Sequence, residues 1–256
     1  MLELIGLSSG YNGQNTIRDI SLSFQPGRIY TVVGRNVCGK STLLKTCAGL
    51  LTPGEGRVLL DGQPLDSYAP AERARRISYL SQSRNTPGIS VERLVEHGRY
   101  PRLASPRRLN AEDRAAVENA METMQVTQLR RKNMHELSGG EQQRVYLAMQ
   151  LAQDAPVLLL DEPTTYMDID YQLSLLDLLR RLKVNGKTIV LVLHDLQQAL
   201  NASDGIVVMD GGRVVSAASP QTILAEGVLE RTFHVRIETA SDSTKGYLLN
   251  MEKLYR

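Results

Sequence analysis

The stretch GRNVCGKST at residues 34–42 decides the fold. It fits the pattern G-x-x-x-x-G-K-[S/T], in which backbone N–H groups surround the phosphates of a nucleotide. In that pattern the lysine reaches the β- and γ-phosphates and the following hydroxyl ligates Mg²⁺. The apolar run IYTVV at 29–33 predicts a strand before the loop, and a helix is predicted to begin at Ser41. This strand–loop–helix context predicts a nucleotide site with Mg²⁺, aided by the positive end of the helix.

The rest of the chain has the composition of a globular protein. Of 256 residues, 42% are hydrophobic and 23% are charged, which suffices for a full core. The two cysteines exclude a disulfide framework and suit a reducing compartment. No run of eighteen apolar residues predicts a membrane span, and MLELIGLSSGYNG at the start does not read as a secretory signal. We therefore expect any contact with a membrane to run through a partner.

The charge distribution is uneven. A formal net charge of +2 argues against a dedicated nucleic-acid-binding protein. Residues 84–135, however, hold ten Arg and Lys against six Asp and Glu. Two interpretations stay open: a solvated helical face, or a docking surface for a partner.

The order of predicted elements indicates a strand-and-helix core interrupted by helices. Strands are predicted at 2–7, 20–24, 58–60, 77–80, 157–161 and 188–193, and a hairpin at 206–209 and 213–216. Helices are predicted from Asn110, from Ser138 and over 171–183, with Asp113 and Glu141 three residues after the two capping residues. We expect residues 1–84 and 156–256 to form the core and residues 85–155 the helical insertion.

Polar side chains follow three of the predicted strands, at the edge where open α/β sheets bind ligands. Asp161 ends VLLLD and suits Mg²⁺, and Glu162 next to it can polarise an attacking water. His194 follows TIVLVL and suits a sensor of the γ-phosphate, and Gln82 follows ISYL and suits Mg²⁺ or the water. Read alone, the carboxylates are helix caps and the histidine a structural residue; the phosphate loop favours the functional interpretation.

A second candidate anion site lies in LSGGEQQR at residues 137–144, the signature stretch. Ser138 and Glu141 have the spacing of a capping box, which explains both without any ligand. Gly139 and Gly140 weaken the first helical turn but let a phosphate approach bare backbone N–H groups. Two anion sites in one chain predict a nucleotide held between two copies.

Together these motifs resemble the ATP-binding subunits of ABC transporters, across essentially the whole chain. The resemblance implies an α/β fold: a P-loop NTPase core with a mixed sheet, an N-terminal antiparallel β-subdomain and an inserted α-helical subdomain. It implies ATP hydrolysis with Glu162, His194 and Gln82 as catalytic residues, and Mg²⁺ held by Ser41, Gln82 and Asp161. The implied ATP-binding residues are Tyr11, Gly34, Arg35, Asn36, Val37, Cys38, Gly39, Lys40, Ser41, Thr42, Ser138, Gly139, Gly140, Glu141 and Asp168. Among these, Tyr11 is expected to stack on adenine.

Within that family, DEPTTYMDI, VLHDLQQA and EHGRYPRL are similar to importers of ferric siderophores, haem and cobalamin. The resemblance implies a homodimer on membrane-embedded permease subunits, peripheral at the cytoplasmic face of the inner membrane and served indirectly by a substrate-binding protein. It implies docking of the permease near residues 84–108, with Arg99 and Arg102 expected on that surface. Iron-siderophore import is the favoured function. A soluble ABC ATPase of DNA repair or translation is disfavoured, since no second cassette, long coiled coil or zinc cysteines occur.

Val37 departs from the family pattern G-x-N-G-x-G-K-S-T, which has glycine at this position. If that position needs a positive φ, a β-branched residue carries a penalty of about 1–2 kcal/mol. We expect Val37→Gly to tighten ATP binding and raise ATPase activity. A nucleotide-binding regulatory subunit with weak hydrolysis stays open as an alternative.

Overall fold

The computed structural model describes residues 1–82, 85–103, 108–242 and 246–253. A six-stranded mixed sheet with the order β10-β9-β3-β8-β7-β6 forms its centre. Its strands are β3 (Ile29–Gly34), β6 (Ile77–Leu80), β7 (Val157–Asp161), β8 (Thr188–Val192), β9 (Gly205–Asp210) and β10 (Arg213–Ala218). Only β10 runs antiparallel to its neighbour. Every residue of β7 and β8 is buried, which explains their continuous apolar sequences.

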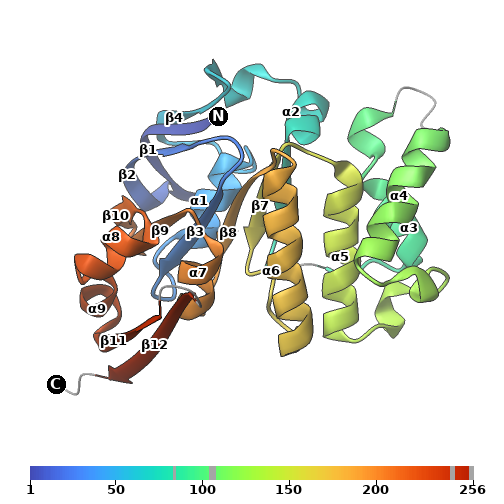
Figure 1. Ribbon diagram of the computed structural model, residues 1–256. Coiled ribbons are helices and arrows are strands. Elements are labelled where there is room, and N and C mark those ends of the chain that lie inside the picture. The colour runs from blue at the N-terminus through green and yellow to red at the C-terminus, as the bar shows by residue number, and fades with distance from the viewer. Residues whose placement is uncertain (83–84, 104–107, 243–245, 254–256) are drawn as a thin grey trace.

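A four-stranded antiparallel sheet covers one side of the core (Figure 1). It has the order β2-β1-β4-β5, with β1 (Leu2–Tyr11), β2 (Gln14–Phe24), β4 (Glu55–Leu60) and β5 (Gln63–Pro64). Helix α1 (Lys40–Cys47) buries Leu43, Leu44 and Cys47 in one cluster with residues of both sheets. Burial raises the pKa of the Cys47 thiol to about 12. The phosphate loop therefore continues into a helix fixed between the two sheets.

Between β6 and β7 the described chain is helical, apart from short connecting segments, and its helices stand on the right in Figure 1. The α-helices are α3 (Val91–His97), α4 (Ala111–Thr123) and α5 (Gly139–Gln153), joined by the 3-10 turns η2 (Tyr100–Arg102), η3 (Thr127–Leu129) and η4 (Met134–Glu136). Asn110 and Ser138 form the two predicted capping boxes, with Asp113 and Glu141. The predicted fold class is confirmed, while the exact division at residues 85 and 155 stays a prediction.

The structure corrects the expectation that Arg99 lies on a docking surface. Its side chain is 6% exposed, and its Nε donates to Asp113 Oδ1 at 2.8 Å. Arg99 Nη1 also donates to the carbonyl of Ala152 at 2.9 Å. Arg102 donates to the carbonyls of Gln153 and Asp154, so its guanidinium is engaged within the chain. The prediction was wrong because the sequence places Arg99 in a basic stretch that is typical of a solvent-exposed surface. Its buried partner, Asp113, is identified only in the folded structure.

The last part of the chain alternates helices and hairpins. It contains α6 (Ile169–Val184), α7 (Leu196–Ala202), α8 (Pro220–Ala225) and α9 (Val228–Phe233). The hairpin predicted around residues 210–212 is confirmed as β9 and β10. A second hairpin, β11 (Val235–Asp242) with β12 (Gly246–Lys253), was not predicted. Asn201 on α7 holds it through two hydrogen bonds with the backbone of Tyr247. No helix among the described residues has the length and apolarity needed to cross a bilayer.

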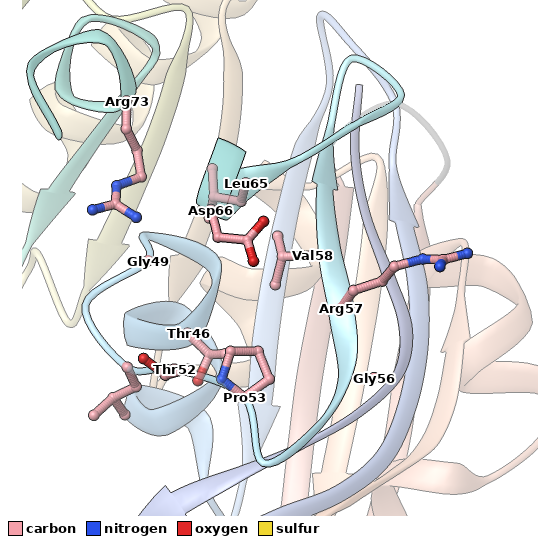
Figure 2. Close-up of a pocket in the computed structure, with 11 residues that line it drawn as sticks. Thr46, Gly49, Thr52, Pro53, Gly56, Arg57, Val58, Leu65, Asp66 and Arg73 are labelled. Carbon is pink, nitrogen blue, oxygen red and sulfur yellow. The ribbon is translucent and has the colours of Figure 1, made fainter. Parts of the chain in front are cut away.

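Helix α1 ends in a Schellman motif. Leu50 N–H donates to the carbonyl of Lys45, and Gly49 N–H donates to that of Thr46, with Gly49 at a φ of 69°. A Cβ on Gly49 would lie 2.7 Å from Nη1 of Arg73, which comes from α2 (Pro70–Arg76). Figure 2 shows the Arg73 guanidinium over Gly49, at a hollow of about 170 Å³ beside β4. This hollow contains none of the predicted site residues.

Candidate nucleotide site

The two ends of the phosphate loop pack too closely against their neighbours for any residue but glycine. A Cβ on Gly34 would lie 2.3 Å from the carbonyl oxygen of Met209, so only glycine fits against β9. Gly39 has a φ of 101°, and a Cβ there would lie 2.5 Å from Ile17 Cγ2. The Lys40 ammonium donates to the carbonyls of Gly34 and Arg35, each at 2.9 Å. These bonds hold the lysine inside the curve of the loop, where the pattern requires it.

Val37 adopts the left-handed conformation on which the sequence argument depends. Its φ is 64°, and its side chain is 96% exposed. A left-handed conformation costs a residue with a Cβ about 1–2 kcal/mol relative to its preferred geometry. No packing within the described chain offsets that cost, because the side chain is almost completely in solvent.

The register of the central strands brings three predicted side chains together. Leu80 pairs with Leu160, and Asp161 pairs with Val192, so β6, β7 and β8 end at one edge of the sheet. Gln82 Nε2 donates to Glu162 Oε2 at 2.6 Å, and His194 Nε2 lies 2.6 Å from Glu162 Oε1. Glu162 is 9% exposed and has a φ of 52°. Both oxygens of one nearly buried carboxylate thus have a polar partner, in a backbone conformation that non-glycine residues seldom adopt.

Asp161 offers a ligand suited to a hard cation. The residue is 1% exposed, its Oδ2 accepts from the Tyr79 hydroxyl at 3.3 Å, and its Oδ1 has no partner in the described chain. Burial raises the pKa of this carboxyl, while the hydrogen bond from Ser41 lowers it. A buried, unpaired carboxylate oxygen beside a hydroxyl fits Mg²⁺, which binds through one or two carboxylates together with substrate phosphates. Asp161 and Ser41 thus fit the predicted magnesium site, while Gln82 contacts Glu162 through its amide nitrogen and its part in metal binding stays a prediction.

A groove of about 560 Å³, called the phosphate-loop groove below, is lined by part of the phosphate loop and by Gln82, Glu162 and His194, but not by Asp161. Tyr11, 43% exposed, contributes to its wall, and Lys45 Nζ lies 5.6 Å from the centre of the Tyr11 ring. The other lining residues are Thr16, Asn36, Val37, Gly39, Lys40, Ser41, Thr42, Gln82, Glu162 and His194. Most predicted site residues therefore meet in one groove.

The signature stretch lies apart from that groove in the same chain. Gly139 lines a separate signature groove of about 520 Å³, and Gln82 is the residue that lines both. Ser138 N–H and its hydroxyl both donate to Glu141, which lowers the pKa of that carboxyl. Asp168 caps α6 by accepting from Tyr171 N–H at 3.0 Å. One chain thus does not bring Ser138, Gly139, Gly140, Glu141 or Asp168 to the phosphate-loop groove.

The motifs and geometry agree with comparisons to known proteins. A family model described as ABC transporter matches residues 17–165. The ferric enterobactin transport ATP-binding protein FepC of Escherichia coli (strain K12) is 39% identical over 94% of this chain and 89% of its own length. This chain belongs to the ABC transporter family. The iron(3+)-hydroxamate import ATP-binding protein FhuC of Bacillus subtilis (strain 168) is 36% identical over 92% of this chain and 88% of its own.

Solved structures support the fold of this ABC ATPase. An inward-facing putative metal-chelate type ABC transporter matches with a TM-score of 0.82 and 24% identity, over 100% of this chain and 98% of that one. The CbiO1 subunit of Clostridium perfringens, described as part of an ABC transporter complex, matches with a TM-score of 0.75 and 29% identity, over 90% and 92%. The chain is an ATPase of this family and uses ATP with Mg²⁺.

Sequence reasoning missed several residues around the ATPase site. Thr16 lines the groove from β2, and no motif marks it because β2 reaches the loop only through the folding of the antiparallel sheet. The sequence predicts Tyr79 only as part of a strand, whereas its hydroxyl donates to Asp161. Tyr79 lies three residues before Gln82 and one residue before the end of β6. Alternation along β6 is the signal that places Tyr79 on the same face as Ile77, against the cluster that contains α1.

Proposed function

We propose that this chain is the ATPase subunit of an importer for a ferric siderophore or a similar metal chelate. The observation that carries the catalytic part is the contact of Gln82 and His194 with the two oxygens of Glu162, beside the unpaired oxygen of Asp161. The siderophore assignment is supported by FepC and FhuC, which match over most of their length. The subunit is bound peripherally at the cytoplasmic face of the inner membrane, on permease subunits that receive cargo from a substrate-binding protein.

In this proposal Glu162 polarises the water that attacks the γ-phosphate, giving ADP and phosphate. His194 and Gln82 orient the Glu162 carboxylate, and His194 senses the γ-phosphate. Lys40 and the backbone N–H groups of residues 34–42 bind the phosphates. Ser41, Gln82 and Asp161 hold Mg²⁺, which neutralises charge on the phosphate oxygens. A carboxylate with a polar partner at both oxygens is suited to positioning the attacking water, because its orientation is already fixed before substrate binds.

The separation of the two grooves supports a head-to-tail homodimer. Within one chain, Ser138, Gly139 and Gly140 do not line the phosphate-loop groove. A nucleotide held by Lys40 and Ser41 of one copy meets the signature stretch of a second copy. A two-fold arrangement binds both nucleotides at once, since each copy supplies a phosphate-loop groove to one nucleotide and a signature stretch to the other.

Glu162→Gln tests this site. The amide keeps the shape of the side chain but polarises water poorly, so ATP binding is expected to persist while turnover falls by at least about 100-fold. The variant is then expected to accumulate as an ATP-dependent dimer in size-exclusion chromatography. Glu122→Gln, on the exposed side of α4, is the matched control and keeps the parent rate. Hydrolysis by Glu162→Gln at the parent rate would exclude Glu162 as the base.

Contact with the permease is proposed for the basic part of the helical segment, near residues 84–108; residues 84 and 104–107 lie outside the described ranges. A groove of about 610 Å³ there is lined by Arg93, Arg108 and Arg130 together with acidic residues. Arg93 and Arg108 are exposed, and in the test they replace the buried Arg99 and the exposed Arg102, whose guanidinium binds two backbone carbonyls. Reversing both to Glu is expected to reduce siderophore uptake in cells that hold the permease while sparing basal ATPase. Unchanged uptake would refute docking at this surface.

Two other functions have an observation in their favour. The cobalamin import protein BtuD of Halobacterium salinarum is 36% identical over 96% of this chain, which supports a cobalamin importer. The left-handed Val37 supports a nucleotide-binding subunit with weak hydrolysis. Uptake of labelled ferric siderophore, haem and cobalamin by the complete transporter separates the cargoes. The steady-state turnover number of the purified complex separates a transport ATPase from a regulatory subunit.

A further inference from the structure

Two exposed apolar side chains share an unusual backbone conformation. Val37 has a φ of 64° and is 96% exposed, and Tyr166 has a φ of 68° and is 78% exposed. Both carry an apolar group largely into solvent from a left-handed position, which costs free energy that contacts within the chain do little to offset. Strained residues of this kind cluster at active sites and ligand clamps.

Tyr166 lies directly against the signature stretch. A Cβ on Gly139 would lie 3.5 Å from Cβ and Cγ of Tyr166, and one on Gly140 would lie 2.9 Å from its carbonyl oxygen. The glycines therefore leave room for the tyrosine at the start of α5. Ile169 and Leu173 are 60% and 52% exposed and lie four residues apart on α6. They extend the apolar surface along one face of that helix.

Val37 and Tyr166 line different grooves of the same chain. Val37 belongs to the phosphate-loop groove, and Tyr166 belongs to the signature groove. The head-to-tail dimer of the proposed function places the phosphate loop of one copy opposite the signature stretch of the other. In that dimer, Val37 of one copy faces Tyr166 of the other.

We propose that Val37 of one copy packs against Tyr166 of a second copy when the ATP-bound dimer closes. This apolar clasp rests on the proposed dimer and adds a contact made by this chain's own departure from the family pattern. Two-fold symmetry forms it twice, once beside each nucleotide. The clasp gives the valine a function: its side chain leaves water when the dimer forms, which offsets the strain of its backbone.

Cross-linking tests the clasp directly. Val37→Cys and Tyr166→Cys are combined in a chain that also carries Glu162→Gln, and a short bis-maleimide is added with and without ATP. A covalent dimer is expected only with ATP. Val37→Cys with Val184→Cys is the control pair, since Val184 is 84% exposed at the far end of α6. The native Cys38 and Cys47 are 5% and 1% exposed, so the Glu162→Gln chain without new cysteines is expected to stay uncross-linked.

A double-mutant cycle measures the same contact without new cysteines. In the Glu162→Gln chain, Val37→Gly or Tyr166→Ala is each expected to weaken ATP-dependent dimerisation by about tenfold or more, from the lost burial of one side chain per site. The double variant is expected to be no weaker than the worse single variant, because both remove one contact. In parallel, calorimetry on dilute, monomeric protein measures ATP binding alone. Val37→Gly is not expected to weaken it, so weaker dimerisation of this variant is assigned to the lost contact.

The outcomes separate the clasp from the proposed function. A Glu162→Gln chain that dimerises with ATP but gives no cross-link, or additive effects in the cycle, would overturn the clasp and leave the ATPase dimer intact. A Glu162→Gln chain that binds ATP and stays monomeric would overturn the head-to-tail dimer and the clasp with it. An ATP-dependent cross-link together with non-additive effects supports both.

Discussion

The buried ion pair between Arg99 and Asp113 is expected to hold the helical segment together. Arg99 and Asp113 are 6% and 5% exposed, with a distance of 2.8 Å between Nε and Oδ1. Arg99→Met removes the cation and the hydrogen bond to the Ala152 carbonyl, but keeps a long apolar side chain. Asp113 then remains as a buried charge, although its Oδ2 still accepts from Asn110 N–H.

The expected loss follows from this burial. Removing one partner of a buried ion pair costs about 3–5 kcal/mol, because the other charge stays out of water without compensation. A domain is stable by about 5–15 kcal/mol, so the loss is a large share of the total. Replacing both charges, with Arg99→Met and Asp113→Asn together, is expected to recover part of it, because no uncompensated charge then remains.

Urea unfolding followed by circular dichroism measures the effect. Arg93→Met is the matched control, since Arg93 pairs with Glu96 at 2.9 Å but is 58% exposed. Exposed pairs contribute little to stability, so this variant is expected to unfold at the same urea concentration as the parent. If Arg99→Met also unfolds within about 1 kcal/mol of the parent, the burial argument is wrong. If Arg99→Met destabilises the protein, substitutions of Arg99 cannot be used to test permease docking, because they would disturb the fold itself.

Three further outcomes are expected. Val37→Gly should tighten ATP binding to the single chain by about 5–30-fold, as calorimetry measures, if the wild-type loop incurs its strain of about 1–2 kcal/mol only when ATP binds; equal affinities with a gain in unfolding free energy would place the strain in the loop at all times. Gly49→Ala should lower the free energy of unfolding by about 1–2 kcal/mol, since alanine is strained at this left-handed position and the Arg73 side chain would have to move; an unchanged urea midpoint would contradict this. Because the pKa of Glu141 is lowered in the folded protein, its carboxylate stabilises the fold at pH values above the pKa of the unfolded chain, and this stabilisation is lost as the pH falls through the pKa of the folded state. Glu141→Gln should therefore remove this contribution to the loss of unfolding free energy in acid. An identical pH dependence of the unfolding free energy in both proteins would refute the contribution of Glu141.

The sequence was informative where chemistry and backbone pattern coincide. The loop at 34–42 needs glycine, lysine and a hydroxyl in fixed order, so the sequence alone predicts it. Asp161, Glu162 and His194 follow apolar strands, and parallel strands end at a common edge. That rule alone predicts that they lie near one another, and Glu162 contacts both His194 and Gln82, while their catalytic roles stay a prediction.

The sequence was uninformative where one residue depends on a distant one. Arg99 is buried because Asp113, fourteen positions away, and the end of α5 fold against it. The C-terminal hairpin depends on Asn201, which binds the backbone of Tyr247 from a neighbouring helix. Neither contact has a local pattern, since both arise from tertiary packing that composition and periodicity do not encode.

The alignment of β7 with β8 has a consequence for how such a protein changes over generations. Glu162 and His194 meet because Asp161 stands beside Val192 in a ladder whose residues are all buried. A shift of one residue would force every side chain of a strand into space that is close-packed around a different side chain, so selection on packing alone already preserves the meeting point. Mutations that adapt the outer helices to a new permease or cargo can therefore accumulate while the hydrolytic centre is inherited unchanged.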